Sequence, residues 1–250
     1  MTKLQNFILV SIFPFLTFLL LITTWQTLSY LGFFESWLLP SPIMIINELY
    51  DSKVFLLKHT LTTASEIIIG LFFAVSFGII IGTLMSNYKY IERSLLPYVI
   101  ASQVIPIFAL APILIVWFGA GLISKIIVVF LISFFPIVIG VFDGLRKKSI
   151  EMENMLKTMG AKNFQIFKII KIKLALPSFF SGLKVASVSS VIGAVVAEWI
   201  GSKSGLGWIM KVSGPLFQTE RVFAAIVLLS IFASMLFLGV KLLEKKIVKG

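Results

Sequence analysis

Residues 146–173 read RKKSIEMENMLKTMGAKNFQIFKIIKIK and form a polar segment between two long apolar stretches. The segment carries eight Lys and Arg side chains, a helical stripe of apolar residues and a glycine near its middle. The sequence on either side suits lipid, because a bilayer core admits long apolar helices and disfavours charge. We therefore expect this polar segment to lie on one side of a membrane and to contact a partner there.

Composition places the chain among polytopic membrane proteins. Of its 250 residues, 58% are hydrophobic and 13% are charged, whereas a soluble domain is about half apolar and about a quarter charged. Apolar runs recur that are long enough to cross a ~30 Å hydrocarbon core as helices, and about six spans of ~20 residues would use about half of the chain. The loops are then too short for a separate soluble domain. The sequence predicts an all-α fold with a single transmembrane domain over residues 1–250.

The expected spans leave short loops between them. They cover residues 7–24, 61–85, 95–118, 123–142, 176–200 and 223–243. A signal peptide is the competing interpretation of the first range, but the bulky residues 23–26 give no small-residue cleavage site. The third span holds Pro106 and Pro112, so we expect it to be kinked and surrounded by protein. A short surface helix is expected after Pro40, because Pro42 suits a first helical turn.

Charge placement predicts the orientation. With the N-terminus inside, the inner segments hold most of the Lys and Arg residues, including those of the polar segment. The positive-inside rule then puts both termini and the polar segment in the cytoplasm. We expect a multi-pass protein of the cell membrane.

Several function classes are disfavoured. The net charge of +11 is placed beside spans and is not interleaved with exposed aromatic residues, so no nucleic-acid partner is expected. Cysteine is absent, and His59, next to Lys58, is interpreted as an interfacial side chain. No glycine-rich phosphate loop, nucleophile motif or metal-ligand cluster occurs. We expect no enzyme activity, metal or cofactor on this chain.

Two expected spans carry small residues at every fourth position, which share one helix face. The first ridge is Gly70, Ala74, Gly78 and Gly82, and the second is Gly182, Ala186, Ser190 and Ala194. Small side chains let helices approach closely in lipid, so both ridges predict packing within one bundle. The second helix also carries Ser187 and suits the wall of a polar pathway.

Glu198 continues the second ridge near the expected outer interface. A buried carboxylate needs a partner, because an unpaired charge in a low-dielectric site is costly. Two hypotheses stay open: a structural ion pair with Lys203 or Arg221, or an outer gate that shapes the path of a small polar solute. The predicted substrate pathway is Glu198, Ser190, Ser187 and Gln103.

Within the polar segment, Met152, Met155, Leu156 and Met159 follow a three-to-four spacing that predicts a short helix over residues 151–159. Gly160 suits the left-handed residue that ends many helices, and Asn163 can cap the next helix. Flexible methionines suit a contact surface. An amphipathic pair lying on anionic lipid is the alternative.

The polar segment resembles the "EAA" loop of ATP-binding-cassette (ABC) importer permeases. That loop has a Glu-Ala-Ala start, a Gly some six residues after the Glu, and a later Leu-Pro. The matching runs are residues 158–161, residues 165–167 and Leu176-Pro177. The triplet position is Asn154-Met155-Leu156, with Glu153 one residue early, which leaves the contribution of an acidic residue open. The resemblance implies an ATPase-coupling interface at Glu153, Met155, Leu156, Met159, Gly160 and Ala161.

The similarity extends over nearly the whole chain. The runs that are similar to the nitrate, sulfonate, taurine and pyrimidine-precursor subfamily are residues 39–42, 103–106, 109–112, 117–119, 197–199 and 205–207. Residues 192–199 and 217–225 look most like permeases for hydroxymethylpyrimidine, a thiamine precursor. This resemblance implies two copies of the permease in the bilayer, two cytosolic ATPase subunits that bind the ATP, and an extracytoplasmic substrate-binding protein.

Two other function classes compete with an importer permease. An ion-coupled secondary transporter would use the acidic residues in or near spans, Glu66 and Glu198, since such residues are functional suspects. No repeat of broken helices in the two halves supports it. A purely structural membrane anchor leaves the glycine-broken polar segment unexplained.

Overall fold

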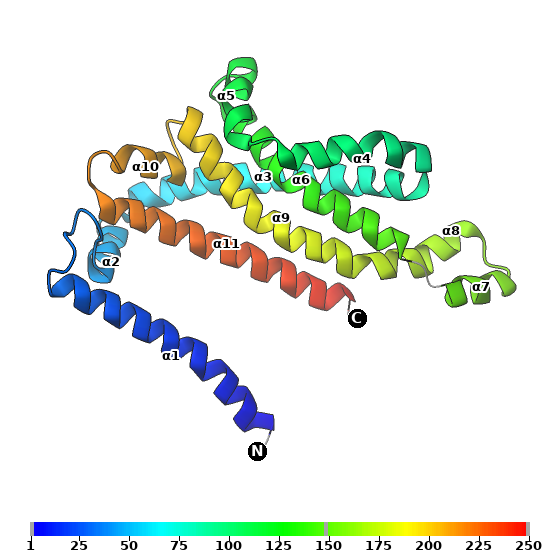
Figure 1. Cartoon of the computed structure of the whole chain (residues 1–250), viewed down its shortest axis with the longest axis horizontal. Helices are drawn as coiled ribbons and strands as arrows, with labels where there is room; N and C mark the ends of the chain where they lie inside the picture. Colours follow the sequence, from blue (N-terminus) through cyan, green and yellow to red (C-terminus); the bar gives the residue numbers. More distant parts are fainter. Residues whose placement is uncertain (1–2, 148–149, 249–250) are drawn as a thin grey trace. The chain divides into compact units, whose positions relative to one another are not determined.

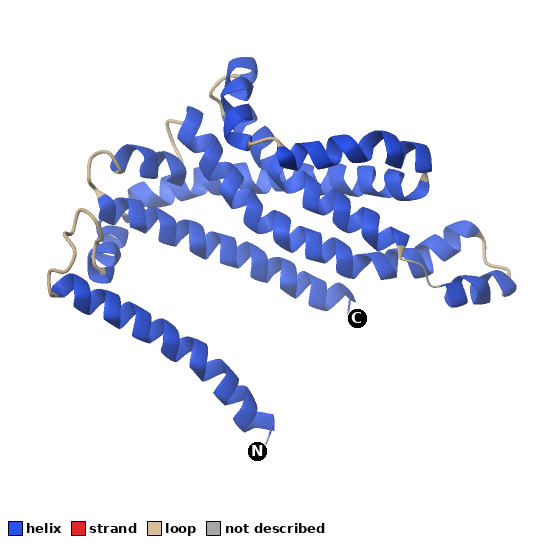
Figure 2. Cartoon of the chain, viewed as in Figure 1, coloured by secondary structure: helices blue, strands red, loops and turns tan. Residues whose placement is uncertain are grey.

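The computed structural model describes residues 3–147 and 150–248, and every regular element in these ranges is helical (Figure 2). The all-α prediction is confirmed. The chain divides into two compact units: Met1–Lys58 with Ile209–Leu228, and His59–Trp208 with Leu229–Gly250. Figure 1 labels the helices of both units. We call them the first and second unit and describe each by itself.

The first unit contains α1 (Lys3–Tyr30), α2 (Pro42–Asp51), and parts of α10 (Leu206–Ser213) and α11 (Thr219–Val248). The short helix expected after Pro40 is α2, with Pro42 in its first turn and the Ser41 hydroxyl accepting a hydrogen bond from the Met44 N–H. Arg221 Nε donates to Glu48 Oε1 at 2.7 Å. In α1 the described apolar side chains from Ile12 onward are mostly exposed, as suits a helix surrounded by lipid.

The second unit is built on the long helices α3 (Lys53–Asn87), α6 (Leu122–Arg146) and α9 (Ile172–Gly201), with the later part of α11. A Cβ on Gly78 of α3 would lie 2.6 Å from Ile137 of α6. A Cβ on Gly182 of α9 would overlap the Pro136 carbonyl oxygen of α6. Close helix approach therefore depends on small residues at both sides of α6.

The third expected span is not one continuous helix. It consists of α4 (Lys89–Val104) and α5 (Ile107–Phe118), which meet at a 100° bend. Ile105 is extended, at φ −71° and ψ 121°, because a residue before proline is pushed out of the helical region. Pro106 then lacks the N–H that would continue the helix. The expectation of one kinked helix underestimated this break.

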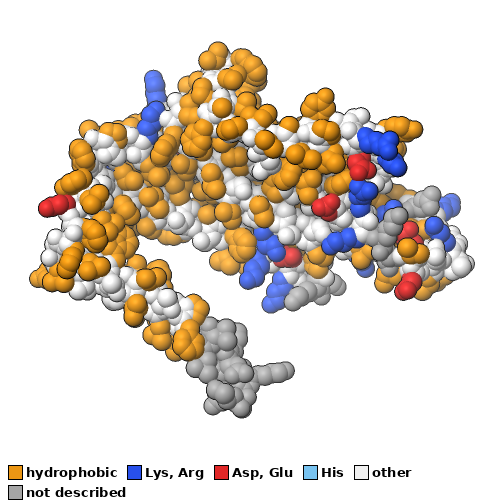
Figure 3. Space-filling view, in the orientation of Figure 1, with side chains coloured by type: hydrophobic (Ala, Val, Ile, Leu, Met, Phe, Trp, Pro, Cys, Tyr) orange, Lys and Arg blue, Asp and Glu red, His pale blue; other side chains and the backbone are white. Residues whose placement is uncertain are grey.

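Within the described residues, five helices are long and apolar enough to cross a membrane, or up to six if the bent α4–α5 pair is one span. The helix α10 was not expected from the sequence. On the face of the second unit shown in Figure 3, hydrophobic side chains predominate, and many of the charged side chains gather toward the end that carries α7 and α8.

Candidate functional site

The polar segment folds as a helix, a glycine turn and a second helix. The first helix, α7, covers Ile150–Thr158. Gly160 has φ +81°, and after it the Ala161 N–H donates to the Leu156 carbonyl at 2.9 Å. This backbone bond spans a left-handed glycine, which is the geometry that commonly ends helices. The predicted helix and its glycine stop are both present.

The second helix starts differently from the prediction. The Lys162 N–H donates to Gln165 Oε1 at 2.7 Å, as in a capping box, and the Ile166 N–H donates to the Lys162 carbonyl. Lys162 therefore occupies the cap position, and Asn163 is already the first residue of α8 (Asn163–Ile166). No sequence pattern favoured a lysine as the cap, because the side chain that accepts the Lys162 N–H belongs to Gln165, three residues on.

A π-helical turn, η1 (Phe167–Lys171), joins α8 to α9 without a loop. Ile166 and Ile170 are buried, whereas Phe164 is 74% exposed. In Figure 1, α7 and α8 lie beyond the ends of α6 and α9. The turn at Gly160 is thus carried at the tip of a helical path that runs back through the second unit.

The tip exposes methionine side chains among polar and charged ones. Met155 is 57% exposed, Met159 is 74% exposed, and α7 has no buried residue. Glu153, Leu156 and Ala161 are half-buried or nearly so. Methionine side chains on an exposed helix form a patch that fits an interaction surface.

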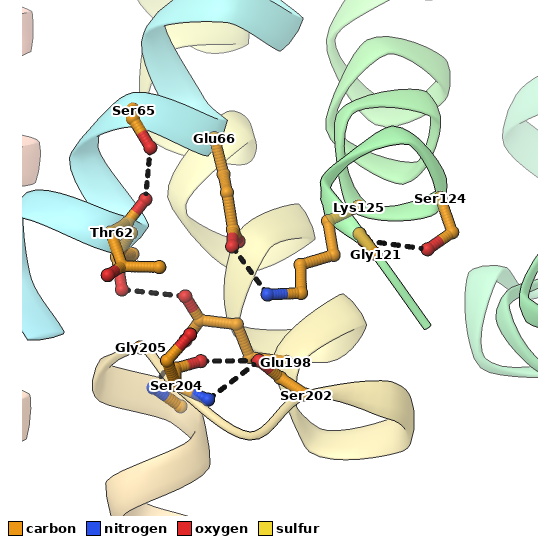
Figure 4. Close-up of polar contacts among 12 residues, drawn as sticks. Thr62, Ser65, Glu66, Gly121, Ser124, Lys125, Glu198, Ser202, Ser204 and Gly205 are labelled. Carbon is orange, nitrogen blue, oxygen red and sulfur yellow. Dashed lines mark hydrogen bonds and ion pairs between the residues drawn. The ribbon is translucent and has the colours of Figure 1, made fainter. Parts of the chain in front are cut away.

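A second arrangement lies inside the bundle, where charged side chains from three helices converge (Figure 4). Lys125 Nζ of α6 lies 2.7 Å from Glu66 Oε1 of α3. Glu198 of α9 is fully buried, as is Glu66, and Lys125 is 7% exposed. In Figure 4 the carboxyl group of Glu66 points toward that of Glu198. We call Glu66, Lys125, Glu198, His59 and Thr63 the buried cluster.

Glu198 does not pair with the basic residues expected for it. Its Oε1 accepts a hydrogen bond from Thr63 Oγ1 at 2.7 Å, and its Oε2 accepts one from the Gly207 N–H at 2.6 Å. Arg221, one candidate partner, is bonded to Glu48 within the first unit. The structural-pair hypothesis had the wrong partner, because the nearest donors are a hydroxyl and a backbone amide.

The buried cluster holds the turn that starts α10. Three successive backbone N–H groups donate to its side chains: Gly205 to His59 Nδ1 at 2.9 Å, Leu206 to Thr63 Oγ1 at 2.9 Å, and Gly207 to Glu198. The first N–H groups of a helix have no partner within the helix, so these side chains supply what α10 lacks. His59 also stacks on Trp208, with ring centroids 5.2 Å apart.

His59 is therefore not interfacial as expected: it is 6% exposed and accepts a backbone hydrogen bond. Thr63 and Lys125 were not singled out from the sequence. A signal existed for α3, since His59, Thr63, Glu66 and Gly70 are spaced by four, three and four and share one helix face. Lys125 had none, because it was counted as a charge at the edge of an outer loop.

Of the four predicted pathway residues, three lie on α9 and Gln103 lies on α4. Ser187 and Ser190 are fully buried and donate to carbonyls of their own helix. Gln103 is exposed at the end of α4, where its amide lies 3.5 Å from the Ile132 carbonyl oxygen. The small residues of the two ridges lie along α3 and α9, and most of those on α3 face α6, as Gly70 does against Val129. A pathway role stays a prediction.

One atom of the buried cluster has no partner. Glu66 Oε2 is buried without a hydrogen bond. Among the described residues, no group of three or more His, Cys, Asp or Glu side chains could hold a metal ion. The buried cluster thus contains two carboxylates and one ammonium. Its acceptors for the backbone N–H groups of the turn are the Thr63 hydroxyl, the His59 imidazole and the Glu198 carboxylate.

Comparison with known proteins gives consistent matches. Residues 74–249 match the family described as "Binding-protein-dependent transport system inner membrane component". A probable ABC transporter permease protein of Haemophilus influenzae is 38% identical over 86% of this chain and 88% of its own length. A formylaminopyrimidine transport permease protein of Halalkalibacterium halodurans is 38% identical over 92% of both chains. A riboflavin transport system permease protein of Chloroflexus aurantiacus is 33% identical over 93% of this chain and 88% of its own.

Proposed function

This chain belongs to the inner membrane components of binding-protein-dependent transport systems, and we propose that it couples import of a small polar solute to a separate ATPase through the α7–Gly160–α8 turn. Two exposed methionines at the tip of the helical path into α9 support this coupling role most directly. Met155 and Met159 are 57% and 74% exposed there. A polytopic protein leaves such an apolar patch outside the bilayer when a partner covers it.

The mechanism follows from the continuity of the helices. A partner that binds α7 and α8 displaces them relative to the bilayer, and η1 joins α8 to α9 without a loop. α9 in turn packs closely on α6 through Gly182. ATP-driven closure of the ATPase pair therefore shifts the balance between inward-open and outward-open arrangements of the spans. The partner ATPase binds the ATP.

Substrate class comes from the relatives. Relatives are named for transport of formylaminopyrimidine and riboflavin, and others for taurine and aliphatic sulfonates. The first of these is 38% identical and matches the length of this chain almost throughout. We propose a pyrimidine precursor of thiamine, such as hydroxymethylpyrimidine, as the transported solute. The family match also favours an ABC permease over an ion-coupled secondary transporter.

The proposed assembly has two copies of this chain, two ATPases and an extracytoplasmic binding protein. Both termini and the polar segment face the cytosol in this arrangement. The chain has no cysteine, so a single introduced thiol is a clean probe of sidedness. Lys157→Cys should react with a membrane-impermeant maleimide only from the cytosolic side, and Lys203→Cys only from outside. Labelling of both from one side contradicts this topology.

The function itself is tested by reconstitution. The chain is purified from its native membrane together with any ATPase that remains bound, and ATP hydrolysis is measured with and without the binding protein loaded with hydroxymethylpyrimidine. We expect hydrolysis to rise when the loaded binding protein is added. If ATP hydrolysis rises only with taurine-loaded binding protein, the proposed substrate is wrong and taurine replaces it. If repeated purifications contain no bound ATPase, the coupling role is refuted.

A further inference from the structure

The turn at residues 205–207 is held by side chains of two different helices. His59 and Thr63 are on α3, four residues apart on one face, and Glu198 is on α9. Each accepts one of three successive N–H groups of the turn. A loop that needed only to connect α9 with α10 would find water for these groups, so a complete set of buried acceptors indicates that the position of the turn is specified.

Thr63 occupies the middle of this arrangement. Its Oγ1 accepts from the Leu206 N–H at 2.9 Å and donates to Glu198 Oε1 at 2.7 Å. The other carboxylate oxygen of Glu198 accepts from Gly207. Hydroxyl and carboxylate thus form a closed ring of bonds with two successive backbone amides. Thr63 is 1% exposed, so water cannot replace its hydroxyl.

The two glycines of the turn are explained by the same carboxylate. A Cβ on Gly205 would overlap the Glu198 carboxyl group, and one on Gly207 would lie 2.9 Å from Glu198 Oε2. Gly205 also has φ +107°, which L side chains rarely adopt. The backbone of the turn therefore contacts the Glu198 carboxylate directly. Side chains at positions 205 and 207 would displace the turn from that carboxylate.

The Glu66–Lys125 ion pair lies beside the ring. Glu66 is on α3, seven residues after His59, and its carboxyl points toward Glu198. Lys125 brings α6 into the same set of contacts. The turn is therefore bonded to α3 and α9, and the charges beside it include one from α6. These are three long helices of the second unit.

We propose that Thr63 is a positioning residue for transport: its hydroxyl, with His59 and Glu198, fixes the start of α10 to α3 and α9. This rests on the proposed function. In the proposed topology the turn lies on the outer side, where the binding protein delivers substrate. Glu198 then acts through the turn, and its buried oxygens are not free to bind a solute in this arrangement.

The test measures amide hydrogen exchange of the full chain in lipid nanodiscs. Thr63→Val keeps the shape of the side chain and removes the hydroxyl. Thr63→Val leaves the Leu206 N–H buried without its acceptor. Exchange at residues 205–207 should therefore rise by about tenfold or more, the order of magnitude expected for an unsatisfied buried donor. Exchange in α6 should stay unchanged. Thr63→Ser, which keeps the hydroxyl, should restore wild-type exchange.

Thr83→Val is the matched control, because it makes the same change on α3 away from the buried cluster. His59→Phe is a second test that keeps a ring over Trp208 and removes the acceptor for Gly205. It should raise exchange at the same turn. Unchanged exchange in either Thr63→Val or His59→Phe overturns the proposed clamp. Equal loss of protection in α6 assigns Thr63 to general stability and also overturns it.

ATP hydrolysis by the complex with its co-purified ATPase distinguishes a positioning role of Thr63 from a role in stability. Thr63→Val should lower stimulation of hydrolysis by the loaded binding protein by about fivefold or more, and Thr63→Ser should recover it. Wild-type stimulation together with a loosened turn overturns the role in transport. If wild-type protein shows no stimulation, the proposed function fails, and the exchange measurement still decides whether Thr63 holds the turn.

Discussion

Gly160 and Gly205 both have positive φ, at +81° and +107°, and each belongs to a turn beside a short helix. Their surroundings differ. A Cβ on Gly160 would meet nothing within 4 Å, whereas one on Gly205 would overlap the Glu198 carboxyl group. The first turn is closed by its own backbone and is exposed. The second is closed by side chains of distant helices and buried.

These surroundings determine what stabilises each turn and what each turn can bind. The α7–α8 turn keeps its shape through local bonds, such as Ala161 to Leu156, and so can present Met155 and Met159 to another protein. The 205–207 turn depends on the packing of α3, α6 and α9. Substitutions in the exposed turn should change association, and those in the buried cluster should lower stability or loosen the 205–207 turn.

The largest effect is expected from Lys125→Met. It leaves Glu66 and Glu198 buried together without a cation, and breaking a buried pair costs about 3–5 kcal/mol. Thermal unfolding in detergent and the yield of folded protein measure this loss. Lys157→Met on α7 is the control and should change neither. A Lys125→Met protein as stable as wild type would contradict the ion pair as a source of stability.

Glycine-to-alanine substitutions compare the two turns directly. Gly205→Ala adds a clash with a fixed carboxylate to the strain of positive φ and should cost about 2–4 kcal/mol. Gly160→Ala adds only the strain, roughly 1–2 kcal/mol. Chemical unfolding of the two purified variants gives both values. Equal costs would mean that the Gly205 turn is not confined by Glu198.

Gly160→Val tests whether the shape of the exposed turn is needed for ATPase docking. A β-branched residue at positive φ is strained, so the turn should adopt another shape while the spans still insert. ATPase pull-down should be lost, and helix content in the membrane should be retained. Normal pull-down and uptake by this variant would rule out docking through the turn.

The smallest effect is expected from Glu66→Gln. The amide oxygen can still accept from Lys125, and the amide N–H₂ can donate toward Glu198, which fills the place of the unpartnered Oε2. Stability should change by less than about 1 kcal/mol, in contrast to Glu66→Leu, which leaves Lys125 buried and unpaired. Unfolding curves of the two variants decide this; equal losses would contradict the hydrogen-bond account.

The helix and turn at residues 150–161 could be predicted from the sequence because their determinants are local. The spacing of Met152, Met155 and Met159 and the single Gly160 are enough to predict a helix and its end. The lysine cap was missed, since a glutamine side chain three residues on decides it. Proline alone was a poor guide within the third and fourth expected spans: Pro97, Pro112 and Pro136 stay inside helices, whereas Pro106 marks a break.

The buried cluster could be predicted only in part. Glu66 and Glu198 were recognised as acidic residues in or near spans, but their neighbours come from three helices that are far apart in sequence. Which faces of α3, α6 and α9 meet is set by long-range packing of small residues such as Gly78 and Gly182. Without that packing, Lys203 and Arg221 were predicted as partners for Glu198. In the structure, a hydroxyl and a backbone N–H donate to it.

Site-specific cross-linking at Met159 shows whether an ATPase contacts the α7–α8 turn. Met159→Cys is the only thiol in the chain, and a short thiol-reactive photocross-linker on it should capture the co-purifying ATPase in native membranes. The same label at Ser76 on α3, inside an expected span, should not. Capture of the ATPase from Met159 and not from Ser76 is the predicted result. Capture of lipid alone from Met159, with an active importer, would contradict coupling through the α7–α8 turn.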